Sequence, residues 1–193
     1  LLVLMTIRLA RRLSRSTMVG AIAGILLTLD GLAFVMSRIG LLDIFQAFFL
    51  VAGVSAVAAD RDWFRHRLAD HLRTIGNPHL NGDFGPALGW RPWRLVAGIM
   101  FGLACGTKWT SMFVLATMGI VSVFWGWSAR RLAGAGTKAW WSFLRDGVPA
   151  FVYLVVVALL TYLATWAKWL VTYPHMVFGK SWAGPAPSPG LSK

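Results

Sequence analysis

The chain has 193 residues, of which 57% are hydrophobic and only 13% are charged. This composition and a mean hydropathy of +0.63 exclude an ordinary soluble domain and indicate a polytopic membrane protein. The net charge of +12 could suggest a nucleic-acid binder, but the basic residues lie between apolar runs rather than on a soluble body. We therefore expect an all-α membrane protein whose partners include membrane lipid and exclude nucleic acid.

Five apolar runs approach the roughly 20 residues that cross a bilayer, and a shorter one at 1–7 is expected to end an earlier helix. The predicted spans lie at 17–37, 41–59, 95–107, 110–128 and 148–167. The short third run predicts either a tilted, partly re-entrant helix or half of a hairpin closed at 107–110, and we favour the hairpin. We expect a single transmembrane domain over 1–193, cut from a longer protein.

Basic residues alternate between the loops, which predicts the orientation of the chain. Four lie at 8–15, six at 61–94 and four at 130–145. The other five are Arg38, Lys108, Lys168, Lys180 and Lys193. Because loops rich in Lys and Arg stay on the cytoplasmic side, residues 60–94 are predicted to form a cytoplasmic connector and 168–193 an extracytoplasmic tail.

Asp30 lies near the middle of the first predicted span. Insertion scales assign an ionised carboxylate at that depth a cost of roughly 2.5–3.5 kcal/mol, so its side chain must face protein or water. A functional site and a carboxylate that caps or staples a neighbouring helix both satisfy this requirement.

The third run contains Gly98, Gly102 and Gly106 at intervals of four residues, which places them on one helix face. Small residues so spaced allow a neighbouring helix to approach closely, so we assign them a packing role. A phosphate loop is rejected because the spacing before Lys108 is wrong and no strand precedes it. The single cysteine, Cys105, and histidines without ligand spacing predict no metal site.

Two cations, Arg38 and Lys108, lie at the predicted outer ends of two spans, and Asp43 follows Arg38 by five residues. Basic residues are depleted from that side, so these two indicate binding of an anion in the membrane interface, such as a lipid phosphate. The alternative is snorkelling, in which both side chains simply reach the headgroups. The residues alone leave both interpretations open.

Two separated segments carry a resemblance to a known family. They read RRLSRSTMVGAIAGILLTLDGLAFVMSRIGLLDIFQAFF and GLACGTKWTSMF. Both resemble the membrane core of the bacterial, actinobacterial-type protein O-mannosyltransferases. The similarity covers nearly the whole chain in order, through VAADRDWFRHRL, GPALGWRPWR and TYLATWAKW.

The resemblance implies a GT-C glycosyltransferase helix bundle in the plasma membrane. Such enzymes transfer mannose, with inversion, from polyprenyl-phosphate mannose to Ser or Thr of secreted acceptor proteins on the extracytoplasmic face. It implies no cofactor, and the secretion translocon is a further candidate partner. The family's presumed base, in an Asp-Glu pair, belongs to a loop that would precede residues 1–7. We therefore expect no catalytic base among the 193 residues and no activity from this piece alone.

The resemblance also suggests roles for individual residues. Arg38 matches the Arg of the motif S-R-x-x-L-L-D, and Lys108 the Lys of G-L-A-x-x-x-K-W, so both are expected to contact the donor phosphate. Asp43 closes the first motif and is expected to orient Arg38 or to cap the following helix. Ser37 and Trp109, in the same motifs, are predicted supporting residues.

Two alternatives remain beside this interpretation. One is a GT-C transferase that moves another sugar from a polyprenyl-phosphate donor to lipid or polysaccharide. The other is a non-enzymatic transporter or scaffold. A transporter should show inverted repeats with broken helices that meet at the midplane. The candidate charges instead gather at one interface, apart from Asp30, to which we assign a structural role.

Overall fold

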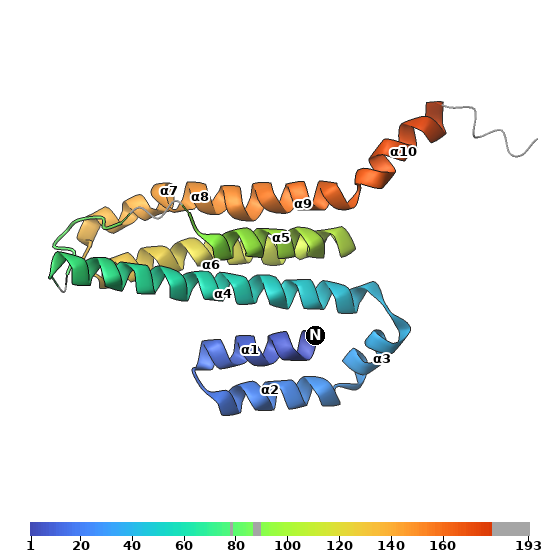
Figure 1. The fold of residues 1–193 in the computed structure, drawn as a ribbon, viewed down its shortest axis with the longest axis horizontal. Helices are drawn as coiled ribbons and strands as arrows, with labels where there is room; N and C mark the ends of the chain where they lie inside the picture. Colours follow the sequence, from blue (N-terminus) through green and yellow to red (C-terminus); the bar gives the residue numbers. More distant parts are fainter. Residues whose placement is uncertain (78, 87–89, 179–193) are drawn as a thin grey trace, which may run out of the picture.

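The computed structural model describes residues 1–77, 79–86 and 90–178, which form helices without a β-strand (Figure 1). The α-helices are α1 (Leu2–Ser14), α2 (Thr17–Leu29), α3 (Gly31–Ile39), α4 (Leu42–Ile75), α5 (Pro92–Thr107), α6 (Ser111–Leu132), α7 (Ser142–Arg145), α8 (Gly147–Phe151), α9 (Val157–Thr165) and α10 (Ala167–Phe178). A 3₁₀ helix, Gly136–Trp141, precedes α7, and a π-helical segment, Val152–Val156, joins α8 to α9.

Membrane-length helices dominate the described residues. Three stretches are long and apolar enough to cross a membrane, namely Leu42–Ile75, Ser111–Leu132 and Gly136–Thr165. The all-α membrane class expected from composition is therefore confirmed.

Helix α5 occupies the centre of the larger group of helices, with α4, α6 and α9 packed around it (Figure 1). Phe101 of α5 is completely buried, and it forms a core with Val57 of α4 and Leu154 of the π-helical segment. Although α5 has only 16 residues, this core fixes it between longer neighbours. It ends at Thr107 and α6 begins at Ser111, so the turn lies within the residues expected to close a hairpin.

The glycines of α5 face the segment that runs from the π-helical turn into α9. A Cβ atom on Gly98 would collide with the carbonyl oxygen of Tyr153, and one on Gly102 would lie 2.6 Å from the carbonyl oxygen of Ala158. A Cβ on Gly106 would likewise lie 3.0 Å from a side-chain atom of α9. The absence of side chains on this face is thus what allows the two backbones to approach.

The first helix is longer than the sequence predicted. The apolar run at 1–7 continues as α1 to Ser14, so three of the four arginines at 8–15 lie on a helix rather than in a loop. Arg15 then turns the chain with a φ of 55°, and the Ser16 side chain caps α2 by accepting from the Val19 amide. Helices α1 and α2 form a hairpin that packs on α4 through α1 (Figure 1).

The predicted span at 17–37 is not one straight helix, and whether it crosses the membrane stays a prediction. The helix breaks at Asp30, and α2 and α3 meet at an angle of 61°. The Asp30 carboxylate accepts hydrogen bonds from the amides of Leu32 at 3.3 Å and Ala33 at 3.2 Å, so it caps the start of α3. Asp side chains compete for backbone N–H groups in this way, which favours helix starts over helix interiors.

Several other helices extend beyond the predicted segments. Helix α4 does not stop at residue 59 but continues to Ile75, so much of the expected connector at 60–94 is helical. Phe64 and Leu68, four residues apart, are buried and extend the apolar face of the helix. Gly76, with a φ of 70°, ends it. The expected tail at 168–193 begins inside α10, and residues 179–193 lie outside the described part of the chain.

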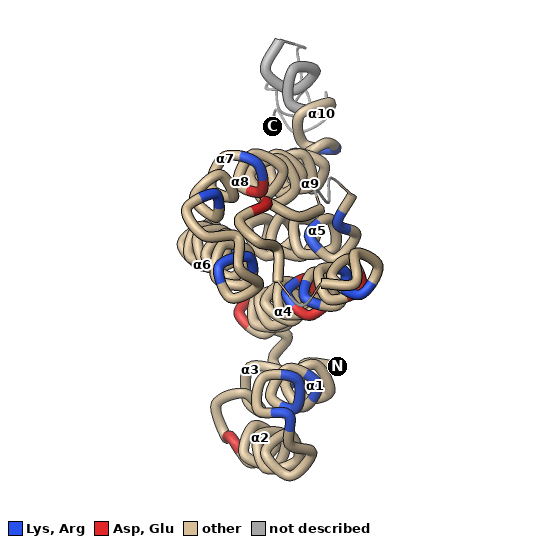
Figure 2. The backbone as a smooth tube through the Cα atoms, turned by 90° about the vertical axis from the view of Figure 1, so that its left-hand side faces the viewer, with Lys and Arg blue, Asp and Glu red and all other residues tan. Residues whose placement is uncertain are grey.

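Most basic residues gather at one end of the bundle. Figure 2 looks onto this end, where Lys and Arg of α1, α4, α5, α6 and α7 face the viewer. Arg38, in the last turn of α3, and Lys108, directly after α5, lie toward the opposite end of the bundle. Which end faces the cytoplasm stays a prediction.

Candidate functional site at the α3–α4 turn

A tight turn separates two residues of the first motif, Arg38 and Asp43. Arg38 lies in the last turn of α3, and Gly40 follows with a φ of 68° that residues with a side chain rarely adopt. The amide of Leu41 donates to the Met36 carbonyl at 3.1 Å, and α4 starts immediately afterwards with Asp43 in its first turn. The sequence thus places a cation and a carboxylate on either side of one turn.

The carboxylate pairs with the other predicted cation. Lys108 Nζ donates to Asp43 Oδ1 at 3.0 Å, and the two side chains are 52% and 41% exposed. This contact joins the start of α4 to the end of α5 across 65 residues of sequence. Of the two roles expected for Asp43, the structure shows neither a contact with Arg38 nor a side-chain cap of α4 among the described residues.

Arg38 is exposed and stacks on its own helix. Its guanidinium carbon lies 5.1 Å from the centre of the Phe34 ring, four residues earlier. No described carboxylate lies within ion-pair distance of it. The guanidinium edge is therefore free to bind an anion from outside the described residues.

A polar contact that the sequence analysis missed supports the Lys108 turn. The side-chain amide of Gln46 donates to the hydroxyls of Thr110 at 3.3 Å and Ser111 at 2.8 Å. Ser111 in turn donates to the Ala104 carbonyl at 3.1 Å. Gln46 lies one helical turn after Asp43 on α4, and this spacing is the only feature of the local sequence that could have indicated its role.

The two supporting residues do not touch this ion pair. Ser37 donates to the Phe34 carbonyl at 2.8 Å, and the Trp109 ring packs at 6.3 Å against Phe113. Ser37 and Phe34 instead border an apolar cavity of about 520 Å³ between α1, α2, α3 and α4. Its other lining residues include Leu27, Phe45, Phe48 and Phe49. An apolar chamber thus lies directly beside the helix that carries Arg38.

Among the described residues, no three His, Cys, Asp or Glu side chains come close enough to hold a metal ion. The chemistry available at this end of the bundle is that of two cations, a carboxylate and an apolar cavity. Such a set can bind the phosphate of a lipid.

Comparison with known proteins shows the family to which the chain is similar. A family model described as dolichyl-phosphate-mannose-protein mannosyltransferase matches residues 1–67. A polyprenol-phosphate-mannose–protein mannosyltransferase of Mycobacterium tuberculosis is 39% identical over 171 residues, which cover 89% of this chain and 32% of the relative. One from Corynebacterium glutamicum is 40% identical over 164 residues, 85% of this chain and 31% of the relative.

The chain belongs to the protein mannosyltransferase family. A polyprenol-phosphate-mannose–protein mannosyltransferase of Mycolicibacterium smegmatis is 37% identical over 173 residues, 89% of this chain and 33% of the relative. The chain thus spans about a third of the length of the curated relatives it matches. No solved structure matches it.

A second cluster of charged side chains in this member of the mannosyltransferase family is buried at the end of the bundle where most basic residues gather. Asp60 accepts from Arg91 at 2.6 and 2.9 Å and from Arg94 at 3.0 Å, and all three side chains are at most 2% exposed. Arg94 also donates to the Asp146 carbonyl at 3.1 Å. This cluster ties α4 to the start of α5 and to the junction before α8.

Arg130 forms the other half of the cluster. Its guanidinium makes two hydrogen bonds to the Asp146 carboxylate at 2.9 and 3.1 Å, and it donates to the carbonyl of Phe84 at 2.7 Å. The sequence alone indicates only that these arginines are loop charges that orient the chain. Nothing local marks them as buried, because their carboxylate partners lie 16 to 34 residues away.

Proposed function

We propose that this chain is the donor-binding part of a plasma-membrane glycosyltransferase. The enzyme would transfer mannose from polyprenyl-phosphate mannose to Ser or Thr of secreted proteins. The observation that supports this best is the pair of exposed cations, Arg38 and Lys108, at one end of the bundle beside an apolar cavity. The names of the relatives state the same donor and a protein acceptor.

The proposed chemistry requires positive charge where the leaving group departs. When the bond between mannose and the prenyl phosphate breaks, negative charge develops on the phosphate oxygen, and a preorganised cation there lowers the barrier. Arg38 suits this role because its planar fork can donate two parallel hydrogen bonds to phosphate oxygens. Lys108 would supply a point charge, held in position by Asp43 at 3.0 Å.

The apolar cavity suits the lipid part of the donor. Its volume of about 520 Å³ lies within the range of about 300–1,000 Å³ typical of ligand pockets, and aromatic side chains of α4 line it. We propose that it takes the first isoprene units while the phosphate lies at Arg38. The active face would then be extracytoplasmic, with secreted acceptors and the translocon as partners.

The direct test uses the intact protein in membranes with labelled polyprenyl-phosphate mannose and a Ser/Thr-rich acceptor peptide. We expect the peptide to acquire label, and we expect EDTA to leave transfer unchanged because the proposal involves no metal or other cofactor. Label in lipid or polysaccharide but not in peptide would indicate a transferase with another acceptor. No transfer to any acceptor would favour a transporter or scaffold.

A further inference from the structure

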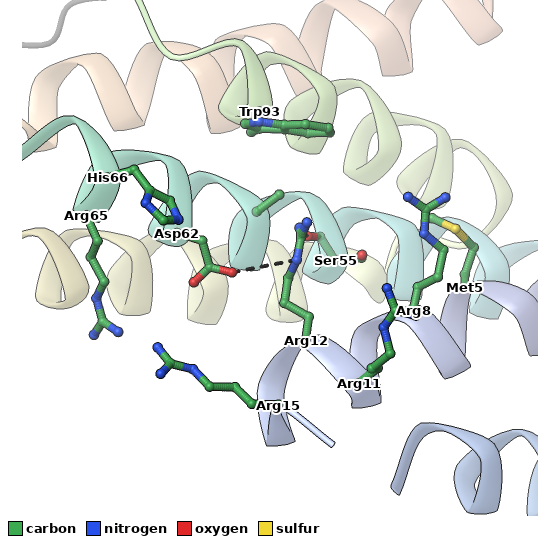
Figure 3. A pocket seen from close by; sticks show the side chains of 11 residues that line it. Met5, Arg8, Arg11, Arg12, Arg15, Ser55, Asp62, Arg65, His66 and Trp93 are labelled. Carbon is green, nitrogen blue, oxygen red and sulfur yellow. Dashed lines mark hydrogen bonds and ion pairs between the residues drawn. The ribbon is translucent and has the colours of Figure 1, made fainter. Parts of the chain in front are cut away.

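A cavity at the other end of the bundle is lined by arginines. It has a volume of about 790 Å³ between α1, α4 and α5. We call it the arginine pocket, and its lining residues are Met5, Arg8, Arg11, Arg12, Arg15, Ser55, Ala59, Asp62, Arg65, His66 and Trp93. Figure 3 shows side chains from α1 on one side of it, those of α4 along it and Trp93 of α5 across from α1.

Four of the five arginines that line the pocket lie within residues 8–15. Arg8, Arg11 and Arg12 follow the spacing i, i+3 and i+4, which places them on one face of α1, and Arg15 lies at the turn directly after this helix. If these side chains only snorkelled to the headgroups, they would have no reason to share a cavity with α4. Their arrangement instead concentrates positive charge around one cavity.

The positive charge of the pocket is mostly uncompensated. Its one carboxylate, Asp62, pairs with Arg12 at 3.6 Å (Figure 3) and also with Arg61 at 3.0 Å. The other lining arginines have no carboxylate within ion-pair distance in the part of the chain that the structure describes. Their mutual repulsion would be relieved by an anion with several oxygens, and guanidinium groups bind phosphate as a fork.

The surroundings of the pocket indicate a lipid as the source of that phosphate. The exposed Trp93 lies in its wall, and indole rings favour the headgroup level of a membrane. Directly after Arg15, α2 presents Met18 and Ile22 to the outside, 74% and 47% exposed. Acyl chains could lie on this apolar surface while the headgroup enters the pocket.

This pocket is separate from the proposed donor site. From Asp43 to Asp62, α4 rises about 28 Å, close to the hydrocarbon thickness of about 30 Å. We therefore propose that the arginine pocket binds the phosphate headgroup of an anionic phospholipid in the leaflet opposite the donor site. The inference does not depend on the proposed transfer reaction.

The test measures phospholipid binding to the intact, delipidated protein in a neutral detergent by native mass spectrometry. We expect phosphatidylglycerol to bind more tightly than phosphatidylcholine. Arg11→Gln with Arg15→Gln should weaken phosphatidylglycerol binding about thirtyfold, because each cation near an anionic lipid contributes appreciably to affinity. Both side chains are exposed and have no ion-pair partner among the described residues, so the protein should still fold.

The matched control is Arg67→Gln with Arg73→Gln, which removes the same charge from exposed positions of α4 outside the pocket. It should leave phosphatidylglycerol affinity within about twofold of wild type, since charges outside the pocket are screened over roughly a Debye length. If the first pair unfolds the protein, Arg65→Gln alone is used, with a smaller loss expected. Equal binding of the two lipids, or equal losses in pocket and control variants, would overturn the proposal. Glycerol phosphate binding as tightly as phosphatidylglycerol would also overturn it, because the pocket would then serve a soluble anion.

Discussion

Arg38 is expected to contribute to the transfer reaction rather than to the stability of the fold. Arg38 is exposed and has no described carboxylate partner, so Arg38→Ala should leave the fold intact. If Arg38 stabilises the departing phosphate, turnover should fall about a hundredfold, or about 3 kcal/mol. Mannose transfer at equal membrane abundance, with saturating and with low donor, measures this loss.

The control for Arg38 must be an exposed cation outside both sites. Arg73→Ala is suitable because its side chain is 81% exposed, and it should retain nearly full transfer. Arg38→Lys should recover only part of the activity, because it keeps the charge and loses the planar fork. Near-normal transfer by Arg38→Ala at both donor concentrations would reduce Arg38 to a snorkelling residue. Arg130 is unsuitable as a control, since it is fully buried in its pair with Asp146.

The aspartates of the two clusters should differ in their effect on stability. Asp60→Asn would leave Arg91 and Arg94 buried without a countercharge, which should cost about 3–5 kcal/mol. Asp43→Asn breaks a half-exposed pair with Lys108 and should cost no more than about 1 kcal/mol. Thermal unfolding of the purified protein in detergent compares the two variants directly. Equal losses of stability would contradict the inference that the buried pairs of Asp60 with Arg91 and Arg94 stabilise the fold more than the exposed pair of Asp43 with Lys108.

At the scale of elements, the close approach of α5 to α9 can be tested with one methyl group. Gly102→Ala places a Cβ 2.6 Å from both the Ala158 carbonyl oxygen and the Thr161 Cβ, so the helices must move apart. Overpacking of this kind costs about 1–3 kcal/mol, more than the higher helix propensity of alanine returns. Gly119→Ala on α6 is the matched control, because its Cβ would meet nothing within 4 Å. Unfolding in detergent should separate the two, and equal stability would show that α5 and α9 are less tightly packed than described.

At the scale of the whole molecule, helix α4 determines how far the bundle extends beyond the bilayer. Its 34 residues rise about 51 Å, whereas the hydrocarbon core is about 30 Å thick. The part near Ile75 must therefore extend out of the membrane on the side where most arginines gather (Figure 2). This geometry is compatible with the orientation predicted from the basic residues.

The orientation itself can be measured with reporters at three positions. A reporter inserted after Gly82 should be cytoplasmic, because its flanking segments are rich in arginine. One inserted at Trp109, in the turn between α5 and α6, should be extracytoplasmic. A third reporter, inserted at the exposed Lys138, serves as a second cytoplasmic reference. Reversed signals would overturn both the topology and the proposed face of the donor site.

The amino-acid sequence by itself determined the class of the protein, the approximate positions of its helices and the turn at 107–110. These properties depend on hydropathy and spacing over neighbouring residues, which can be read along the chain. The two motifs that contain Arg38 and Lys108 could also be recognised, because each motif consists of a few neighbouring residues. Helix ends were less accurate at Asp30 and beyond residue 59, where a side-chain cap and a buried apolar stripe decide the boundary.

Only the tertiary structure decided which charges meet. Asp43 pairs with Lys108 rather than Arg38, and Asp60 meets Arg94 across 34 residues. An arginine beside an apolar run has the same local pattern whether it reaches solvent, lines a cavity or is buried against a distant carboxylate. Its partner depends on how the helices pack, so the buried cluster and the arginine pocket could be recognised only after α1, α4 and α5 were placed against one another.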